Sequence, residues 1–238
     1  MKTYEKRKKK FVLNNSYFKN RHPESPADPF EVLEYYNQHF ELPYENGKIN
    51  DDWFYECFCE YQKRAGVQNS QFFTPTKTAE RMVDIILDFG VDYNTRILDA
   101  CCGFGQITKV LKKEKFEQIS AFDNDKQMAD ACYDLTGVNA RVFDFTNEEE
   151  YFSDQFNFIV SNPPYETKLL TSFLEFIYEY LYVNGKAVLL IPKGFLDKRR
   201  PEKLVRILNK FAIESREQME ENFLRTKTTA EIVVLKKI

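Results

Sequence analysis

From residue 76 onward, short apolar segments alternate with stretches of helical periodicity, and this alternation limits the fold more than any other feature. Five segments have the length and apolar character of buried strands: 96–100, 119–123, 140–144, 156–161 and 186–191. Helical patterns lie before and between them, at 76–89, 105–115, 126–135 and 168–182. Strands that alternate with helices favour a parallel sheet with helices on both faces.

The last part of the chain departs from this alternation. A strand is expected at 230–235 with no helix after it, and another is expected near 212–217. These two could close the sheet as an antiparallel pair. The sequence therefore predicts an α/β fold with a Rossmann-like, doubly wound, mostly parallel sheet, a C-terminal antiparallel strand pair and a small N-terminal helical extension.

The N-terminal part has a different residue pattern. Residues 1–28 read as a basic, irregular arm, 29–69 as the helical extension, and 70–238 as the α/β domain. Two helices are expected over 29–66, on either side of a break at 42–47. Residues 1–10 carry a local charge of +5, so the other 228 residues carry −3 − 5 = −8. Such an arm could bind phosphates or could be a solvated tail.

Composition excludes several classes of protein. The longest aliphatic stretch, Ala187–Ile191, is far too short to span a membrane, and no apolar segment follows the basic N-terminus as in a signal sequence. The five cysteines lack the paired spacing of a zinc site, and the chain has only two histidines. We therefore expect a cytoplasmic protein in a reducing compartment, with no metal centre and no disulfide framework.

Polar or turn-forming residues follow four of the predicted strands, at 99–105, 123–125, 144–145 and 162–165. The carboxyl ends of parallel strands meet at one edge of a sheet, where ligands bind. Gly103 and Gly105 permit a sharp turn and a close approach to a ligand. Asp123 could accept hydrogen bonds from ribose hydroxyls, if Asp125 caps the next helix and leaves Asp123 free.

The other two strand ends point to an amine. Asp144 and Phe145 combine a carboxylate acceptor with an apolar ring, which would suit adenine. In Asn162-Pro-Pro-Tyr165 the prolines stiffen the loop, which then presents two acceptors, the Asn162 amide oxygen and the Pro163 carbonyl. Two adjacent acceptors suit a primary amine or an amide, and Tyr165 offers a ring on which a planar group could stack.

These acceptors address a chemical difficulty. The amino nitrogen of adenine is a poor nucleophile because its lone pair is delocalised into the ring. Acceptors that bind its protons would favour a more nucleophilic nitrogen, which could attack a sulfonium methyl group held in line about 3–3.5 Å away. No strong general base is needed beforehand, because the proton becomes acidic once the nitrogen is alkylated.

On these residues the chain resembles the class I S-adenosylmethionine-dependent methyltransferases, and more narrowly the N6-adenine DNA methyltransferases whose cofactor motif precedes Asn-Pro-Pro-Tyr. The resemblance covers 70–238 and includes Gln71-Phe-Phe-Thr-Pro75. It implies S-adenosyl-L-methionine as cofactor, bound by Phe73, Thr74, Pro75, Asp99, Cys101, Gly103, Gly105, Asp123, Asn124, Asp144 and Phe145. It also implies catalysis by Asn162, Pro163, Pro164 and Tyr165 on a flipped adenine of DNA.

Recognition of the target is expected to differ from that of these relatives. They usually carry a target-recognition domain after the catalytic fold, whereas here the helices of 29–66, the loops at 165–170 and 193–203, or a partner protein would read the sequence. The candidates for substrate contacts are Phe195, Phe223, Lys198, Arg199 and Arg200. Restriction–modification is one setting for such an enzyme.

Three alternatives stay open at the level of sequence. The loop could serve an adenine of RNA, or a glutamine amide as in the release-factor methyltransferases, although those lack the Phe-Phe-Thr-Pro segment found here. A third alternative is an inactive, cofactor-binding subunit, because a fold alone does not prove a function. The intact Asn162–Tyr165 segment argues against it.

Overall fold

The computed structural model describes residues 44–45, 48–49, 74–147, 149, 151–197, 200–222 and 229–238. The chain divides into two compact units, Met1–Phe73 and Thr74–Ile238. In the first unit the described residues form an antiparallel pair of short strands, β1 (Tyr44–Glu45) and β2 (Lys48–Ile49). β1 falls within the expected break at 42–47, and β2 lies directly after it. The helices themselves and the basic arm at 1–28 lie outside the described residues.

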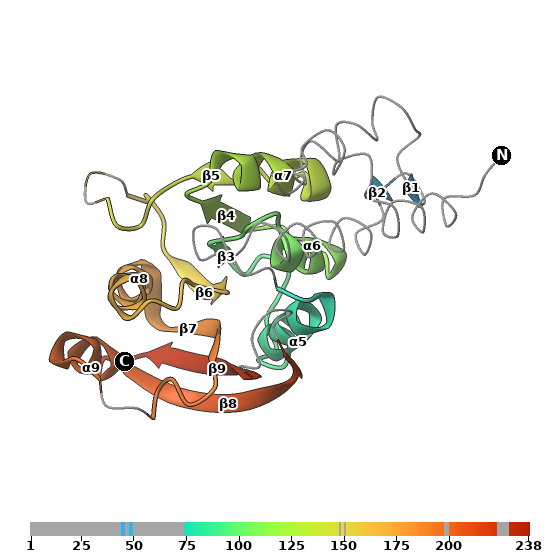
Figure 1. Cartoon of the computed structure of the whole chain (residues 1–238). Coiled ribbons are helices and arrows are strands. Elements are labelled where there is room, and N and C mark those ends of the chain that lie inside the picture. Colours follow the sequence, from blue (N-terminus) through green and yellow to red (C-terminus); the bar gives the residue numbers. More distant parts are fainter. Residues whose placement is uncertain are drawn as a thin grey trace, which may run out of the picture. The chain divides into compact units, whose positions relative to one another are not determined.

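The second unit is built on a seven-stranded sheet with the order β5-β4-β3-β6-β7-β9-β8 (Figure 1). Its strands are β3 (Ile97–Ala100), β4 (Ile119–Asp123), β5 (Arg141–Val142), β6 (Phe156–Ser161), β7 (Leu181–Pro192), β8 (Phe211–Asn222) and β9 (Thr229–Lys237). Strands β3 to β7 pair in parallel, whereas β9 is antiparallel to both β7 and β8. The predicted α/β fold and its C-terminal antiparallel pair are confirmed.

The order of the strands reverses between β3 and β6. The chain runs outward from β3 through β4 and β5, then returns to the other side of β3 as β6. Ala100 and Ser161 end these two strands as register partners, and the Ser161 hydroxyl donates to the Ala100 carbonyl at 2.6 Å. Ligands of open α/β sheets bind beyond the carboxyl ends of the strands at such a reversal. The loops that follow Ala100 and Ser161 therefore begin side by side at the place where a site is expected.

Helices cover both faces of the sheet (Figure 1). On one side lie α5 (Thr76–Leu87), α6 (Gln106–Lys113) and α7 (Lys126–Thr136), and on the other lie α8 (Thr167–Tyr180) and α9 (Glu202–Leu208). The sequence predicted all of these except α9, whose seven residues are too few to show a clear period. It forms because Leu204 and Ile207 are buried against the core, and Pro201 stands at its start.

Phenylalanines fill the core between the sheet and α8. Phe122 of β4 meets Phe143 and Phe176 edge to face, with ring centroids 5.0 and 5.4 Å apart. Phe143 and Phe176 belong to the same buried cluster, and such aromatic pairs stabilise a fold by about 0.5–1.5 kcal/mol beyond their burial. This packing fixes β4 against α8, and so fixes the loops that precede and follow these elements.

Candidate active site

The turn after β3 depends on left-handed backbone. Cys101, Gly103 and Gly105 have φ angles of 57°, 55° and 87°. A Cβ on Gly105 would also lie 2.7 Å from Cys132 Sγ of α7, closer than such atoms can approach. Only glycine therefore suits position 105, where the turn passes into α6. The expected glycine turn at the carboxyl end of β3 is present.

Asp99, the third residue of β3, is buried directly before this turn. It is fully buried, and its Oδ2 accepts hydrogen bonds from the Thr108 backbone N–H at 2.8 Å and from the Thr108 hydroxyl at 2.5 Å. Its Oδ1 is buried without a hydrogen-bond partner among the described residues. Burial raises the pKa of Asp99 to about 7, against the effect of the two bonds from Thr108. The site thus contains a buried acceptor that still lacks a donor.

Asp123 ends β4 beside the turn, but it is not free as expected. Its Oδ2 accepts from the Gly103 N–H at 2.9 Å and its Oδ1 from the Asp125 N–H at 3.0 Å. Burial raises the pKa of Asp123 above its usual range. The carboxylate thus holds the glycine turn to β4, and a ribose could use only its remaining lone pairs. Asn124, the next residue, is exposed.

Asp144 and Phe145 follow β5 at the same edge. Asp144 Oδ1 accepts from the Thr146 N–H at 2.9 Å and from the Thr146 hydroxyl at 2.7 Å, which shapes a local turn. The Phe145 ring is half-buried and packs edge to face on Phe173 of α8, with centroids 5.4 Å apart. An acceptor and an apolar ring are therefore brought together as the sequence predicted.

The Asn162-Pro-Pro-Tyr165 loop follows β6 directly. The Asn162 amide nitrogen donates to the Thr74 hydroxyl at 3.1 Å. The Tyr165 hydroxyl donates to the Asn162 amide oxygen, the atom that sequence reasoning left open for a substrate. Pro163 is buried, Tyr165 is half-buried, and burial raises the pKa of the Tyr165 hydroxyl well above its usual value. The expected acceptor is present, and the loop's own tyrosine donates to one of its two lone pairs.

Thr74 and Pro75 precede α5 and reach the same edge. Thr74 is buried and contacts Asn162, while Pro75 occupies the N-cap position of α5. In the first turn of α5, the Thr76 hydroxyl accepts from the Gln106 amide of α6 at 2.8 Å. This segment therefore joins the Asn162–Tyr165 loop to the helix that follows the glycine turn. Phe73 lies outside the described residues.

The segment after β7 does not present its aromatic residue to a substrate. Phe195 is buried in the core, and the Arg200 guanidinium lies 3.6 Å from the centre of its ring and donates to the Phe195 carbonyl. A ring covered in this way offers no face to a flipped base, so Phe195 is a packing residue in this structure. Phe223, Lys198 and Arg199 lie outside the described residues.

A cluster of basic residues follows β7 in the sequence: Lys193, Lys198, Arg199, Arg200, Lys203 and Arg206. Most of its described members are paired with nearby groups. Lys203 is 2.9 Å from Glu175 of α8, and Arg206 pairs with Glu202 one turn away. Lys193, which directly follows β7, is exposed. Exposed pairs of this kind contribute little to stability, yet they leave less positive charge available for phosphates than the sequence suggests.

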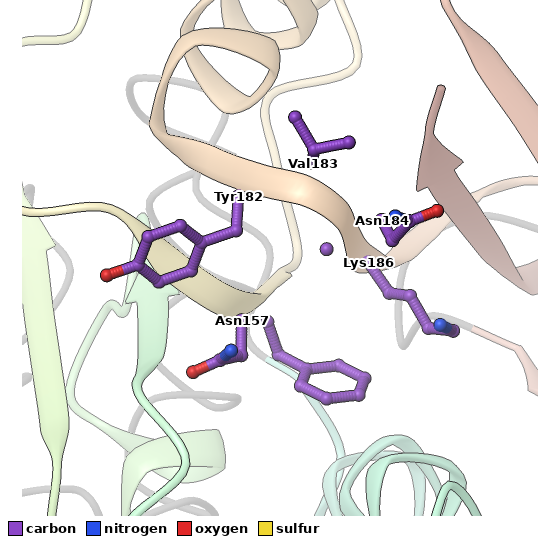
Figure 2. Close-up of a pocket in the computed structure, with 7 residues that line it drawn as sticks. Asn157, Tyr182, Val183, Asn184 and Lys186 are labelled. Carbon is purple, nitrogen blue, oxygen red and sulfur yellow. The ribbon is translucent and has the colours of Figure 1, made fainter.

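A hollow of about 250 Å³ opens at the other edge of the sheet, at the amino ends of β6 and β7 (Figure 2). Asn157, Tyr182, Val183 and Lys186 line it. The side-chain Oδ1 of Asn157 accepts from the Arg96 backbone N–H at 3.0 Å, and Lys186 lies 4.6 Å from the centre of the Phe89 ring. The hollow is thus separate from the edge where the sequence-predicted residues meet.

Among the described residues, no group of three or more His, Cys, Asp or Glu side chains is arranged to hold a metal ion. Within the same part of the chain, no helix has the length and apolar character needed to cross a membrane.

Thr108 is the site residue that sequence reasoning missed. It stands in α6, nine positions after Asp99, and both its hydroxyl and its backbone N–H hold that carboxylate. The sequence signal that could have indicated this role is a threonine nine positions after the aspartate near the end of a strand. Its role depends on how the turn folds back, which the local pattern does not reveal.

Comparisons with known proteins agree with this fold. The family model of the methyltransferase small domain matches residues 84–226. No curated protein matches the sequence significantly. A candidate class I S-adenosylmethionine-dependent methyltransferase from Listeria monocytogenes has the same fold, with a TM-score of 0.61 and 15% identity over 78% of this chain and 67% of that one.

Two further structures are similar. A candidate RNA methyltransferase from Pyrococcus horikoshii has a TM-score of 0.57 and 16% identity over 71% of this chain and 85% of that one. The magnesium protoporphyrin IX methyltransferase of Synechocystis, solved with bound SAH, has a TM-score of 0.53 and 12% identity over 68% of this chain and 83% of that one. These findings support S-adenosyl-L-methionine as the cofactor. The family model covers more than half of this chain, so the chain belongs to the methyltransferase small domain family.

Proposed function

We propose that the chain transfers a methyl group from S-adenosyl-L-methionine to the N6 amino group of adenine in DNA. The observation that carries this proposal is the position of Asn162-Pro-Pro-Tyr165 beside the glycine turn. Ala100 and Ser161 are register partners, so the two loops start next to each other at the reversal of the strand order. An amine held by one loop would therefore lie close to a cofactor held by the other.

The residues around the turn fit this cofactor. A cationic ammonium group would supply the donor that the buried Asp99 Oδ1 lacks among the described residues. Asp123 and Asn124 would hold the ribose, and Asp144 with Phe145 the adenine ring. Cys101, Gly103 and Gly105 would let the backbone approach closely, and Pro75 would border the methionine part. When bound, the cofactor supplies an electrophilic methyl group on sulfur.

The catalytic loop prepares the nucleophile. The Asn162 amide oxygen and the Pro163 carbonyl would accept hydrogen bonds from the two N6–H groups, which would leave the nitrogen lone pair free to face the methyl group. The cofactor, when bound, would supply that methyl group and keep the C–S electron pair on sulfur, and one N6 proton would be lost to solvent. Tyr165 stacks on the base once its hydroxyl has released Asn162. Pro164 keeps the loop stiff between the acceptors and the ring.

An adenine in RNA is the second candidate substrate. The proposed contacts of the loop involve only the base, so they would suit an adenine of either nucleic acid. The candidate RNA methyltransferase of Pyrococcus horikoshii shares the fold of this chain, which is compatible with RNA as well. Neither Lys193 nor the part of the basic cluster that the structure describes distinguishes a DNA backbone from an RNA backbone.

The test uses methyl-labelled S-adenosyl-L-methionine and the full chain. Duplex DNA, single-stranded DNA, ribosomal RNA and a release factor are offered in parallel, and the product is digested and identified. We expect N6-methyladenine in DNA, and no label with Asn162→Ala. Label in RNA would identify RNA, the second candidate, as the substrate. Label in glutamine would reject adenine as the target, and no label despite measured cofactor binding would reject the catalytic proposal.

A further inference from the structure

The side chain of Thr74 reaches the catalytic amide from a segment far away in the sequence. Asn162 Nδ2 donates to Thr74 Oγ1 at 3.1 Å across 88 positions, and Thr74 is only 7% exposed. We propose that Thr74 is a positioning residue that keeps the Asn162 oxygen, rather than the nitrogen, turned toward the target amine. This inference rests on the proposed function in taking Asn162 as the amine acceptor.

The orientation matters because the two ends of an amide have nearly the same shape and opposite chemistry. The oxygen accepts hydrogen bonds and the nitrogen donates them. If the amide rotated by half a turn, Asn162 would present N–H groups to the N–H groups of an amine. In the structure its nitrogen faces Thr74 and its oxygen faces Tyr165. When an amine displaces the Tyr165 hydroxyl, the bond to Thr74 still holds the nitrogen end.

Thr74 is itself well anchored. Pro75 follows it and restricts it to extended backbone, and the Pro75 carbonyl accepts from the Ala79 N–H at 2.9 Å to start α5. Further along α5, the Arg81 guanidinium binds the Glu217 carboxylate of β8 through two nitrogens, at 2.8 and 2.7 Å. A hydroxyl on such a fixed support can impose an orientation on a loop.

This role differs from the one that the resemblance implies. A residue that binds the cofactor should affect cofactor affinity when it is changed. A residue that orients Asn162 should affect the rate of transfer at saturating cofactor and leave the affinity unchanged. Thr74→Val separates the two, because valine fills the same space without a hydroxyl. Thr74→Ser keeps the hydroxyl and tests for rescue.

The experiment measures two quantities for each variant: the dissociation constant of S-adenosyl-L-homocysteine by calorimetry, and the single-turnover rate at saturating cofactor. For Thr74→Val we expect a rate roughly five- to tenfold lower, the value of one hydrogen bond, with an unchanged dissociation constant. Thr74→Ser should restore most of the rate. On the Asn162→Ala background, Thr74→Val should cause no further loss.

Thr171→Val is the matched control. Thr171 is also 7% exposed, and its hydroxyl donates within α8 to the Thr167 carbonyl at 2.7 Å. It should keep the wild-type rate. The proposal is overturned if Thr74→Val keeps that rate, or if its only defect is weaker cofactor binding. The proposed function is tested separately, by identifying the substrate that the wild-type enzyme methylates. The ratio of the variant rate to the wild-type rate can be measured on any amine that the enzyme methylates.

Discussion

The hydroxyl of Tyr165 donates a hydrogen bond to the amide oxygen of Asn162, the atom proposed to accept the target amine. The aromatic ring and the acceptor of the catalytic loop therefore satisfy each other. The bond lies in a partly buried part of the loop, so it stabilises the arrangement of these two side chains in the absence of substrate. The amide oxygen has two lone pairs, so the hydroxyl takes one of them, and an amine that approaches from the same direction would compete with it.

Tyr165→Phe should consequently bind substrate more tightly than the wild type. The ring remains for stacking, while the hydroxyl no longer competes for the Asn162 oxygen. We expect the KM for nucleic acid to fall by roughly two- to tenfold, the range of one hydrogen bond, with little change in kcat. Tyr165→Ala, which also loses the ring, should raise the KM instead. A KM above the wild-type value for Tyr165→Phe would show that the hydroxyl assists binding.

Asn162→Ala should retain cofactor affinity and lose most methyl transfer, because one of two amine acceptors is removed. Calorimetry with S-adenosyl-L-homocysteine and a single-turnover assay measure the two properties. Asn157→Ala is the control, since Asn157 stands at the other end of the same strand and is exposed. Wild-type turnover in Asn162→Ala would exclude this amide as an acceptor.

The layout of the fold was predictable because its elements depend on local patterns. The apolar segment at 156–161 and the polar residues after it have the same bounds in the sequence and in the structure. The alternation of strands and helices also placed the glycine turn and the catalytic loop at one edge.

What the sequence could not show are contacts between residues far apart along the chain. Asp123 was expected to be free, but it holds the Gly103 N–H twenty positions earlier. Phe195 was one of two aromatic candidates for a substrate contact, and the structure buries it under Arg200. These outcomes depend on tertiary packing rather than on local pattern.

The raised pKa of Asp99 predicts a pH dependence of stability. Burial raises this pKa to about 7, whereas an aspartate of an unfolded chain titrates near about 3.9. Between these two pH values the folded protein holds a proton that the unfolded chain has lost. The contribution of protonated Asp99 to the free energy of unfolding is therefore full below about pH 4 and is lost as the pH rises through 7. Relative to Asp99→Asn, the free energy of unfolding of the wild type should fall by at most about 1.4 kcal/mol per pH unit.

Urea unfolding of both proteins from pH 4 to pH 8 measures this difference. The asparagine variant is the reference because its amide does not titrate in this range. Parallel curves for the two proteins would mean that Asp99 stays ionised in the folded state.

The basic arm predicts a salt dependence. Residues 1–10 carry a local charge of +5, and each phosphate contact steepens the fall of affinity with salt concentration. Deletion of residues 1–10 should weaken binding of duplex DNA and flatten the plot of log affinity against log salt. An unchanged slope would reduce the arm to a passive tail. A variant with Lys2, Lys6 and Arg7 changed to glutamine separates the effect of charge from that of length.

Gly105 and Gly137 allow backbone strain to be separated from steric conflict. Both have left-handed backbone, with φ of 87° and 71°, but a Cβ on Gly137 meets no heavy atom within 4 Å, whereas one on Gly105 meets Cys132 Sγ at 2.7 Å. Gly137→Ala should lower the free energy of unfolding by about 1–2 kcal/mol from strain alone. Gly105→Ala adds overpacking and should cost roughly 2–5 kcal/mol.

Denaturant unfolding of the two variants and calorimetry of cofactor binding measure the effects. Gly105→Ala should also weaken cofactor binding, because the turn or α7 has to shift, while Gly137→Ala should leave it unchanged. Adding Cys132→Ala to Gly105→Ala removes the sulfur that the new methyl group meets, so the pair should be less destabilised than the sum of the single changes. Equal losses for the two glycine variants would show that strain alone requires glycine at position 105.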